Sequence, residues 1–144
     1  MTTAQQWRVK WRYLYEKYSM SQYLHKEQEN VSGFNAGDAT FIKEIIHPKN
    51  DHLELPYSLA WGSLEMGASS LPHRLENEEL YYILGGNAMV YVEKEKVELK
   101  TGDTLLIHKN KSQYVRNIGS GKLTFLCIVS PAWEASKEEI LRNI

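Results

Sequence analysis

The chain has 144 residues, of which 42% are hydrophobic and 24% charged, with a formal net charge of −1 at pH 7. This size and composition fit one folded domain and exclude wholesale disorder, and the near-zero charge argues against a protein that binds nucleic-acid phosphates. Every apolar run is shorter than the ~20 residues that span a bilayer, so we expect no membrane segment.

Residues 1–37 form an arm that differs in texture from the rest of the chain. Aromatic and apolar residues recur there at helical spacing, namely Trp7, Trp11, Leu14, Tyr15 and Tyr18. Thr3 with Gln6 resembles a capping box. Aromatic and basic residues also alternate as they would in a strand, but a strand of this length is unusual. We therefore predict a helix.

Aromatic residues are concentrated in this arm. Six of the thirteen Trp and Tyr residues fall within the first 23 positions, which is more apolar surface than a small exposed tail tolerates. We expect the arm to pack across its own barrel or across that of a partner chain.

Short β-type runs separated by turn residues follow the arm. The predicted strands are 39–47, 57–66, 73–84, 88–93, 96–100, 104–108, 112–118 and 122–129. Many short strands with no helical pattern between them indicate an all-β sandwich or small barrel, which we place at residues 38–134.

The last predicted strand and the C-terminal segment complete the pattern. Cys127 is the single cysteine and lies in an apolar run, so we expect a buried, unreactive thiol in a cytoplasmic protein. Ser136 and Glu139 form a capping box ahead of Ile140 and Leu141. Residues 135–144 are therefore predicted to be a short helix.

The strongest indication of chemistry lies in the run from 73 to 84. Residues two apart in a strand share a face, so His73, Glu79 and Tyr81 are expected to point the same way, beside apolar residues. Such a face suits a mostly apolar pocket with a few polar groups. The opposite face ends in Tyr82 and Leu84, which favours packing against another sheet or another subunit.

The spacing of glycines and polar residues resembles that of a known superfamily. Gly67, His73, Glu79 and Gly86 have the spacing of the first cupin motif, and Gly102 begins a run spaced like the second. The flanking sequence is similar to that of small mannose-6-phosphate-isomerase-like cupins. The resemblance implies a cupin jelly-roll barrel and pairing of chains as a homodimer, and it leaves the N-terminal arm unexplained.

In the cupin pattern, positions 73, 75, 79 and 113 bind one metal ion, and this chain departs from it at two of them. It keeps His73 and Glu79 but has Leu75, which offers no lone pair, and Gln113, whose amide oxygen is neutral. The resemblance therefore implies a divalent metal, Mn, Fe, Ni or Zn, held by His73, Glu79 and Gln113. No organic cofactor is expected. His108 stands where the second motif has a proline. It is either a substitute metal ligand or a solvated turn residue.

Other polar residues are assigned by strand parity. Tyr81, Gln113 and Asn117 are predicted to contact a small polar ligand, whereas His25, His47 and His52 are expected at the surface. Three functions stay open: a metal-dependent isomerase or dioxygenase, a metal-independent binding or sensing module, and a structural protein with a vestigial pocket. Binding of a small molecule, with no nucleic acid or membrane as partner, is the function we favour.

Overall fold

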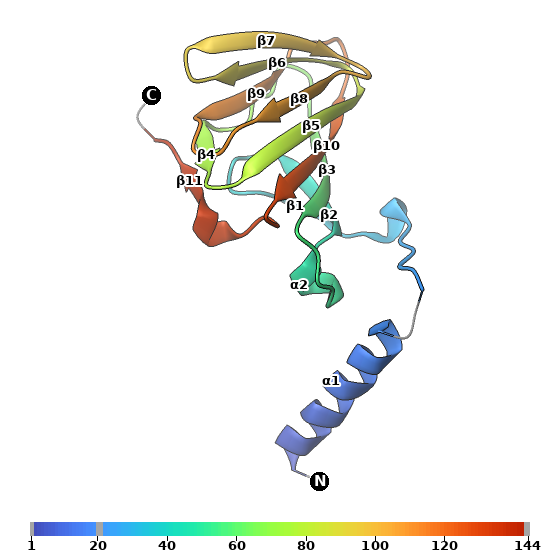
Figure 1. Ribbon diagram of the computed structural model, residues 1–144. Coiled ribbons are helices and arrows are strands. Elements are labelled where there is room, and N and C mark those ends of the chain that lie inside the picture. The colour runs from blue at the N-terminus through green and yellow to red at the C-terminus, as the bar shows by residue number, and fades with distance from the viewer. Residues whose placement is uncertain (1, 20–21, 143–144) are drawn as a thin grey trace.

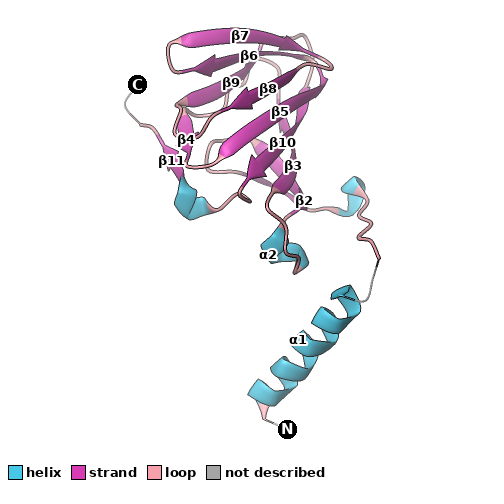
Figure 2. Ribbon diagram, viewed as in Figure 1, coloured by secondary structure: helices cyan, strands magenta, loops and turns pink. Residues whose placement is uncertain are grey.

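Short runs of alternating apolar and polar residues form two antiparallel β-sheets that pack face to face as a barrel (Figures 1 and 2). The structure is a computed structural model, which describes residues 2–19 and 22–142. The six-stranded sheet has the order β1 (Gly33–Asn35), β2 (Phe41–Ile46), β3 (Ser58–Leu64), β10 (Leu123–Ser130), β5 (Glu78–Gly85) and β8 (Thr104–Ile107). The five-stranded sheet has the order β11 (Glu138–Ile140), β4 (His73–Leu75), β9 (Gln113–Asn117), β6 (Asn87–Val92) and β7 (Glu95–Lys100). The expected all-β jelly-roll barrel is confirmed.

Inward-facing side chains of both sheets form the hydrophobic core of the barrel. Phe125 on β10 lies opposite Gly62 on β3 and next to Ile83 on β5. A Cβ atom added to Gly62 would lie 2.6 Å from the Phe125 ring, so glycine lets the ring fill this space. Ile83, Val90 and Phe125 are at most 2% exposed, and burial of each such side chain contributes about 1.5–3 kcal/mol.

The run predicted as one strand over 73–84 is divided between the two sheets. β4 pairs with β9 and β11, whereas β5 pairs with β8 and β10. The chain crosses from one sheet to the other at residues 76–77, where the Asn77 amide donates a 2.8 Å hydrogen bond to the Pro131 carbonyl. The alternation survives this crossing, because His73, Leu75, Glu79 and Tyr81 are all buried.

The N-terminal arm is helical, as the aromatic spacing predicted. Helix α1 spans Thr3–Ser19, and its capping box lies one residue earlier than expected. The Thr2 hydroxyl accepts from the Gln5 amide at 3.3 Å, and the Gln5 side chain accepts from the Thr2 amide at 2.8 Å. Thr2 rather than Thr3 is the cap because the helix begins after it.

Helix α1 lies apart from the barrel, beyond the short helix α2, Pro48–Asp51 (Figure 1). Its described side chains, residues 2–13, are all exposed, and Trp7 keeps 58% of its surface open. Trp11 meets the ring of His52, which follows α2, edge to face at 5.0 Å between centroids. The side chains of Leu14, Tyr15 and Tyr18 lie outside the described part. The predicted packing of the arm against its own barrel is therefore not seen for residues 2–13.

The C-terminal segment adds a strand where a helix was expected. A 3₁₀ helix covers only Ala135–Lys137, and β11 then pairs antiparallel with β4. β4 has an open edge, and the Leu141 amide donates to the Pro72 carbonyl at 2.9 Å as the strand ends. Residues 138–140 pair with this edge instead of forming the helix that the capping box favours, because the hydrogen-bonding groups of an open strand edge need partners. Both β1 and β11 lie outside the barrel limits predicted from the sequence.

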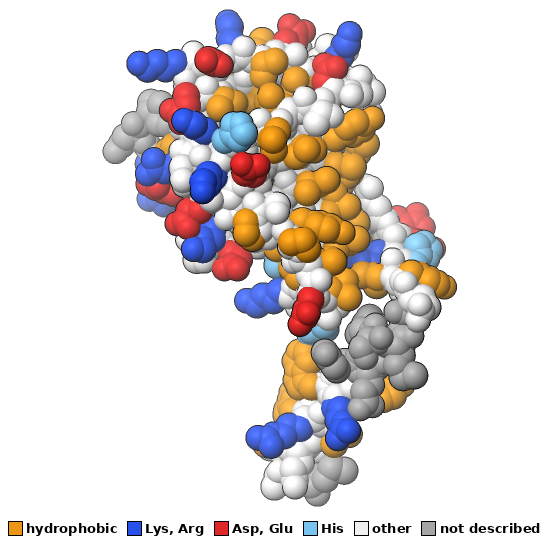
Figure 3. All heavy atoms as spheres, in the orientation of Figure 1, with side chains coloured by type: hydrophobic (Ala, Val, Ile, Leu, Met, Phe, Trp, Pro, Cys, Tyr) orange, Lys and Arg blue, Asp and Glu red, His pale blue; other side chains and the backbone are white. Residues whose placement is uncertain are grey.

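The face of the six-stranded sheet that points away from the barrel is apolar (Figure 3). Strand register places Leu106 beside Leu80, and Leu80 beside Ile128. Leu106, Tyr82 and Ile128 remain 47%, 40% and 37% exposed. In the part of the chain that the structure describes, no second sheet covers this face. Packing of this face against another subunit, one of the two coverings that the sequence left open, stays a prediction.

No helix within residues 2–19 and 22–142 combines the length and the apolar character needed to cross a bilayer.

Candidate functional site

A cavity of about 80 Å³ lies inside the barrel, lined by inward-facing residues of β2, β3, β4, β5 and β10 together with Asp38, Trp133 and Glu138. One water needs ~10–15 Å³ by the same measure, so the cavity has room for several waters or a small molecule. His73 and Glu79 both line it. These two side chains therefore face the same cavity.

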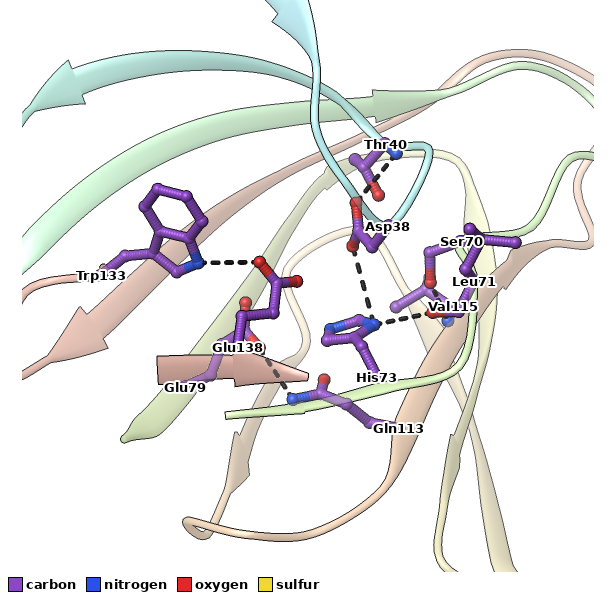
Figure 4. Close-up of polar contacts among 10 residues, drawn as sticks. All are labelled: Asp38, Thr40, Ser70, Leu71, His73, Glu79, Gln113, Val115, Trp133 and Glu138. Carbon is purple, nitrogen blue, oxygen red and sulfur yellow. Dashed lines mark hydrogen bonds and ion pairs between the residues drawn. The ribbon is translucent and has the colours of Figure 1, made fainter. Parts of the chain in front are cut away.

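His73 is held in one orientation by its backbone surroundings (Figure 4). It is 2% exposed, and its Nδ1 lies 2.7 Å from the Leu71 carbonyl oxygen. A carbonyl can only accept, so Nδ1 carries the hydrogen and donates, and the Nε2 of a neutral ring keeps its lone pair. The Asp38 Oδ2 lies 3.8 Å from the same Nδ1. Metal-binding histidines are typically oriented by such a bond from the other ring nitrogen.

Glu79 is a buried carboxyl group with one amide partner. It is 7% exposed, and the Gln113 side-chain amide donates a 2.8 Å hydrogen bond to its Oε2. The pKa of Glu79 is raised to about 7, chiefly by burial; His73 and the Gln113 hydrogen bond lower it, whereas Asp38 and Glu138 contribute to the rise. Glu79 can therefore hold or release a proton near neutral pH.

Gln113 leaves one polar atom without a partner. It lies opposite His73 across the β4–β9 pair and is 2% exposed. Its Nε2 is used by Glu79, whereas its Oε1 is buried and accepts no hydrogen bond within the described residues. Figure 4 shows this oxygen directed toward the imidazole of His73. A buried acceptor with no donor is costly, which makes it a mark of a missing partner.

Two carboxylates that the sequence did not single out complete the site. Asp38 lies in the turn before β2, where its Oδ1 accepts from the Thr40 amide at 3.0 Å. Glu138 comes from β11 and accepts from the indole nitrogen of Trp133 at 3.1 Å. One ligand atom from each of Asp38, His73 and Glu138 lies within 4.8 Å of the others.

These carboxylates give the cavity an excess of negative groups. Among its described lining residues are the acids Asp38, Glu44, Glu79 and Glu138, two histidines, and no Lys or Arg. Burial raises the pKa of Glu138, and Asp38 adds to the rise, while His73 and the Trp133 hydrogen bond lower it. The arrangement favours a proton or another cation in the cavity.

The sequence did not identify Asp38 or Glu138 as site residues, because each stands in a pattern with an ordinary structural explanation. Asp38 stands in a cluster of Gly, Asn and Ala, where an acidic residue is ordinary turn chemistry. Glu138 was assigned to a helix that does not form. Strand pairing of β11 with β4 is the feature that could have identified it.

Tyr81 and Cys127 also line the cavity. Tyr81, predicted to contact a ligand, is 3% exposed and meets Phe125 edge to face at 5.5 Å. Burial raises the pKa of Tyr81 well above 10.0, and Glu79 adds to the rise, so its hydroxyl stays protonated. Burial likewise raises the pKa of the Cys127 thiol, and the expected buried, unreactive cysteine is confirmed.

Like Gln113, Asn117 is not among the residues that line the cavity, although both were predicted to contact a ligand. Its side-chain nitrogen donates to the carbonyls of Leu64 and Gly121 at 3.0 and 2.8 Å, and its oxygen accepts from Gly119 at 3.0 Å. β9 carries Gln113 and Asn117 to opposite ends of its length, where Asn117 pairs with Ala88. Its amide therefore holds a turn together.

The other histidines separate into one buried and three exposed residues. His108 is exposed and lies 3.3 Å from Glu78 on the outside, so it is the solvated residue rather than a substitute ligand. His25 and His52 are exposed, as expected. His47 is not: it is 7% exposed, its Nε2 lies 2.8 Å from the Trp133 carbonyl, and its Nδ1 accepts from the Lys49 amide. The prediction of a surface His47 is wrong because it starts α2 against the C-terminal segment.

Known proteins resemble this chain in sequence and in fold. The cupin domain family matches residues 60–129. The uncharacterized protein MJ1618 of Methanocaldococcus jannaschii is 33% identical over 119 residues, which are 82% of this chain and 94% of that protein. A predicted oxalate decarboxylase from Thermotoga maritima has a TM-score of 0.66 at 19% identity, over 75% of this chain and 99% of its own. Streptomyces Pac13 with uridine has a TM-score of 0.69 at 18% identity, over 87% of this chain and 94% of its own. At such identities the two structures show the shared fold alone.

Proposed function

Because the chain belongs to the cupin superfamily, we propose that its barrel cavity binds a small polar molecule together with a divalent cation. The observation that carries this proposal is the convergence of His73 and Glu79 in one enclosed cavity. Apolar walls with a few convergent polar groups are typical of small-molecule sites. A cavity with several acids and no Lys or Arg among its described lining residues also favours a cation over an anion alone.

The residues present fit a divalent cation of the kind expected, Mn, Fe, Ni or Zn. His73 offers a nitrogen whose ring is oriented by Leu71, and Gln113 offers an amide oxygen without a partner. The sequence assigned His73, Glu79 and Gln113 to the cation, and the structure adds the carboxylates Asp38 and Glu138 nearby. When bound, such a cation polarises an oxygen of the small molecule as a Lewis acid.

Glu79 and Tyr81 supply proton chemistry to the same cavity. A carboxyl group with a pKa of about 7 exchanges its proton near neutral pH, which suits a general acid or base. The Tyr81 hydroxyl, kept protonated by burial, is a hydrogen-bond donor to an oxygen of the ligand. These groups support proton transfer between neighbouring atoms of a polar substrate, and isomerisation is the reaction class we favour.

The small molecule we propose is polar and carbohydrate-like. The flanking sequence is similar to the mannose-6-phosphate-isomerase-like type, and the related Pac13 barrel, described as a nucleoside dehydratase, holds uridine. Both comparisons point to molecules rich in hydroxyl groups. The lack of imidazoles at Leu75 and Gln113 argues against an oxygen-dependent cleavage, which needs a firmly held redox metal.

A metal-independent binding module is the second candidate. The hydrogen bond from Gln113 to Glu79 already gives that carboxyl group a partner without any cation. A Glu79 that keeps its proton also lowers the negative charge of the empty cavity. In this function the same pocket holds the ligand by hydrogen bonds alone.

Thermal stabilisation by small molecules tests the proposed function. Wild-type protein is melted with sugars, sugar phosphates, nucleosides and small organic acids, each with Mn²⁺ and with EDTA. A true ligand at 100 times its Kd stabilises the folded state by about 2.7 kcal/mol, which raises the Tm by several degrees. We expect Glu79→Gln to lose the shift, and Glu98→Gln on the exposed strand β7 to retain it. A shift that survives EDTA supports the second candidate, and no shift in any class contradicts both.

We also propose that the chain forms a homodimer through its exposed apolar surfaces. The outer face of the six-stranded sheet has no cover, and α1 exposes Trp7 and Trp11. Residues 2–19 hold four basic residues and one acidic residue, a net charge of +3, which leaves −4 for the rest of a chain whose total is −1. A basic aromatic helix therefore complements the acidic barrel of a second copy.

A further inference from the structure

We propose that the cation in this barrel is bound by Glu138 of the C-terminal strand together with Asp38 and His73. Glu138 then supplies the ligand that Leu75 cannot. This inference rests on the proposed function, because it names the ligands of the cation proposed there. Two of these three ligands lie outside the run 73–84: Asp38 is in the turn before β2, and Glu138 is on β11.

Strand register places Glu138 next to Leu75, the position at which the cupin pattern has a metal ligand. Glu138 is the direct cross-strand partner of Leu75 in the antiparallel pair of β11 and β4. Directly opposite residues project on the same face, and both side chains line the cavity. The next residue, Glu139, points the other way and forms an ion pair with Arg74 at 2.6 Å. Alternation along β11 therefore separates one inward carboxylate from one outward carboxylate.

The other two ligands are held in place before any cation arrives. Asp38 uses one oxygen to accept from the Thr40 amide, and its backbone carbonyl accepts from the Leu71 amide at 2.6 Å. The Leu71 carbonyl in turn fixes the His73 ring at 2.7 Å. Leu71 thus holds the Asp38 backbone and the His73 ring, and Thr40 holds the Asp38 carboxylate, so little ordering is needed when the cation binds.

A second, independent observation marks the same place. Within the described residues the Oε1 of Gln113 is buried without a hydrogen-bond partner, and Figure 4 shows it directed toward His73. An ionised Glu79 can only accept, so it holds the amide nitrogen and leaves the oxygen without a donor. A cation, or a water bound to it, gives this oxygen the partner it lacks.

The inference has a structural consequence for the C-terminal segment. β11 has three residues and pairs only with β4, and Glu138 is further tied through Trp133. Three residues at a sheet edge are weakly held. A cation bridging Glu138 to His73 and Asp38 fastens this strand to the barrel.

Titration of the full-length protein with Mn²⁺ provides the test. Mn²⁺ is paramagnetic, so its binding is followed by electron paramagnetic resonance and by calorimetry without any activity assay. Glu138→Gln removes the charge but keeps an oxygen that accepts from Trp133, and Glu139→Gln is the matched control one residue away. We expect one Mn²⁺ per wild-type chain, affinity lowered about 10-fold or more in E138Q and D38N, and wild-type affinity in E139Q.

Hydrogen exchange at residues 138–140 is a second readout, independent of the affinity measurement. We expect Mn²⁺ to slow exchange of these amides in the wild type and to leave it unchanged in E138Q. Binding that is lost in Glu79→Gln but intact in E138Q overturns this ligand set while leaving the proposed cation in place. A wild type that binds no Mn²⁺ overturns the inference, whereas the ligand screen with EDTA still decides whether the cavity binds a small molecule.

Discussion

Glu138 and Leu75 face each other across the antiparallel pair of β11 and β4, and both side chains turn into the same cavity. Leu75 occupies a position at which the cupin pattern has a metal ligand, and it is 4% exposed. The carboxylate opposite it comes from a segment more than sixty positions later in the chain. The strand that lacks the expected ligand therefore has a neighbouring strand that brings a carboxylate to the same place in the cavity.

Restoring an imidazole at position 75 should strengthen cation binding. Leu75→His places a nitrogen donor beside Glu138, within the cavity that already holds His73. We expect Mn²⁺ or Zn²⁺ to bind about tenfold or more tightly by calorimetry, the scale of one good ligand contact. Leu75→Met keeps the volume and adds no hard donor, and it serves as the control. Equal affinities in wild type and Leu75→His would refute the placement of the cation beside this residue.

Removing His73 should abolish cation binding, whereas removing His108 should not. His73 is buried and lines the cavity beside Glu79, whereas His108 lies outside the barrel against Glu78. Metal content after purification without chelator, measured for His73→Ala and His108→Ala, separates the two. The same metal content in His73→Ala as in the wild type would contradict the assignment.

The stability of the metal-free protein should fall as the pH rises from about 4 to about 7. Burial raises the pKa of Glu79 from 4.5 to about 7, so between these values the folded protein keeps a proton that the unfolded chain has released. The free energy of unfolding therefore decreases with pH over this range, by up to about 3 kcal/mol at ~1.4 kcal/mol per pH unit.

Denaturant unfolding in EDTA at a series of pH values measures this dependence. Glu79→Gln should flatten the slope, and Glu98→Gln, an exposed carboxyl group on β7, should keep it. An unchanged slope in Glu79→Gln would show that another group is responsible.

Asn117 should matter for stability and not for binding. Its amide makes three hydrogen bonds to backbone groups of Leu64, Gly119 and Gly121. Asn117→Ala should lower the free energy of unfolding by about 2–3 kcal/mol, because it leaves buried backbone groups unpaired. Mn²⁺ affinity of the folded variant should equal that of the wild type. A folded variant with weakened binding would return Asn117 to the ligand site.

A charge on the outer face of the six-stranded sheet should separate the proposed dimer. Leu106→Lys places a cation on that face, on the edge strand β8, where Leu106 adjoins Leu80. We expect light scattering after size-exclusion chromatography to give one chain for this variant and two for the wild type. Ile118→Lys changes an equally exposed apolar residue elsewhere, 42% against 47%, and should remain a dimer. A monomeric wild type would contradict the proposal.

The barrel and half of the site could be predicted from the sequence because they depend on local periodicity. Alternation from His73 to Tyr81 gave the correct inward face even though the run crosses between sheets, since the crossing preserves parity. The helical spacing of Trp7 and Trp11 likewise gave α1. Residues whose roles follow from period-two or helical patterns were accessible in this way.

Asp38 and Glu138 were inaccessible because their roles depend on contacts distant in sequence. Glu138 reads locally as the first turn of a helix, and only the open edge of β4 converts its segment into a strand. Asn117 shows a related limit. Its side chain faces inward, as predicted, but it lies at the end of β9, where its oxygen bonds the Gly119 amide of a turn. Parity gives the face of a residue, whereas strand pairing decides which inward residues meet.

Anomalous diffraction from crystals of the wild-type protein soaked in Mn²⁺ is the most direct test of the proposed site. The account predicts one strong peak inside the barrel, within coordination distance of His73 and Glu138. A fully soaked crystal with no peak in the cavity, or with peaks only at surface carboxylates, would contradict it.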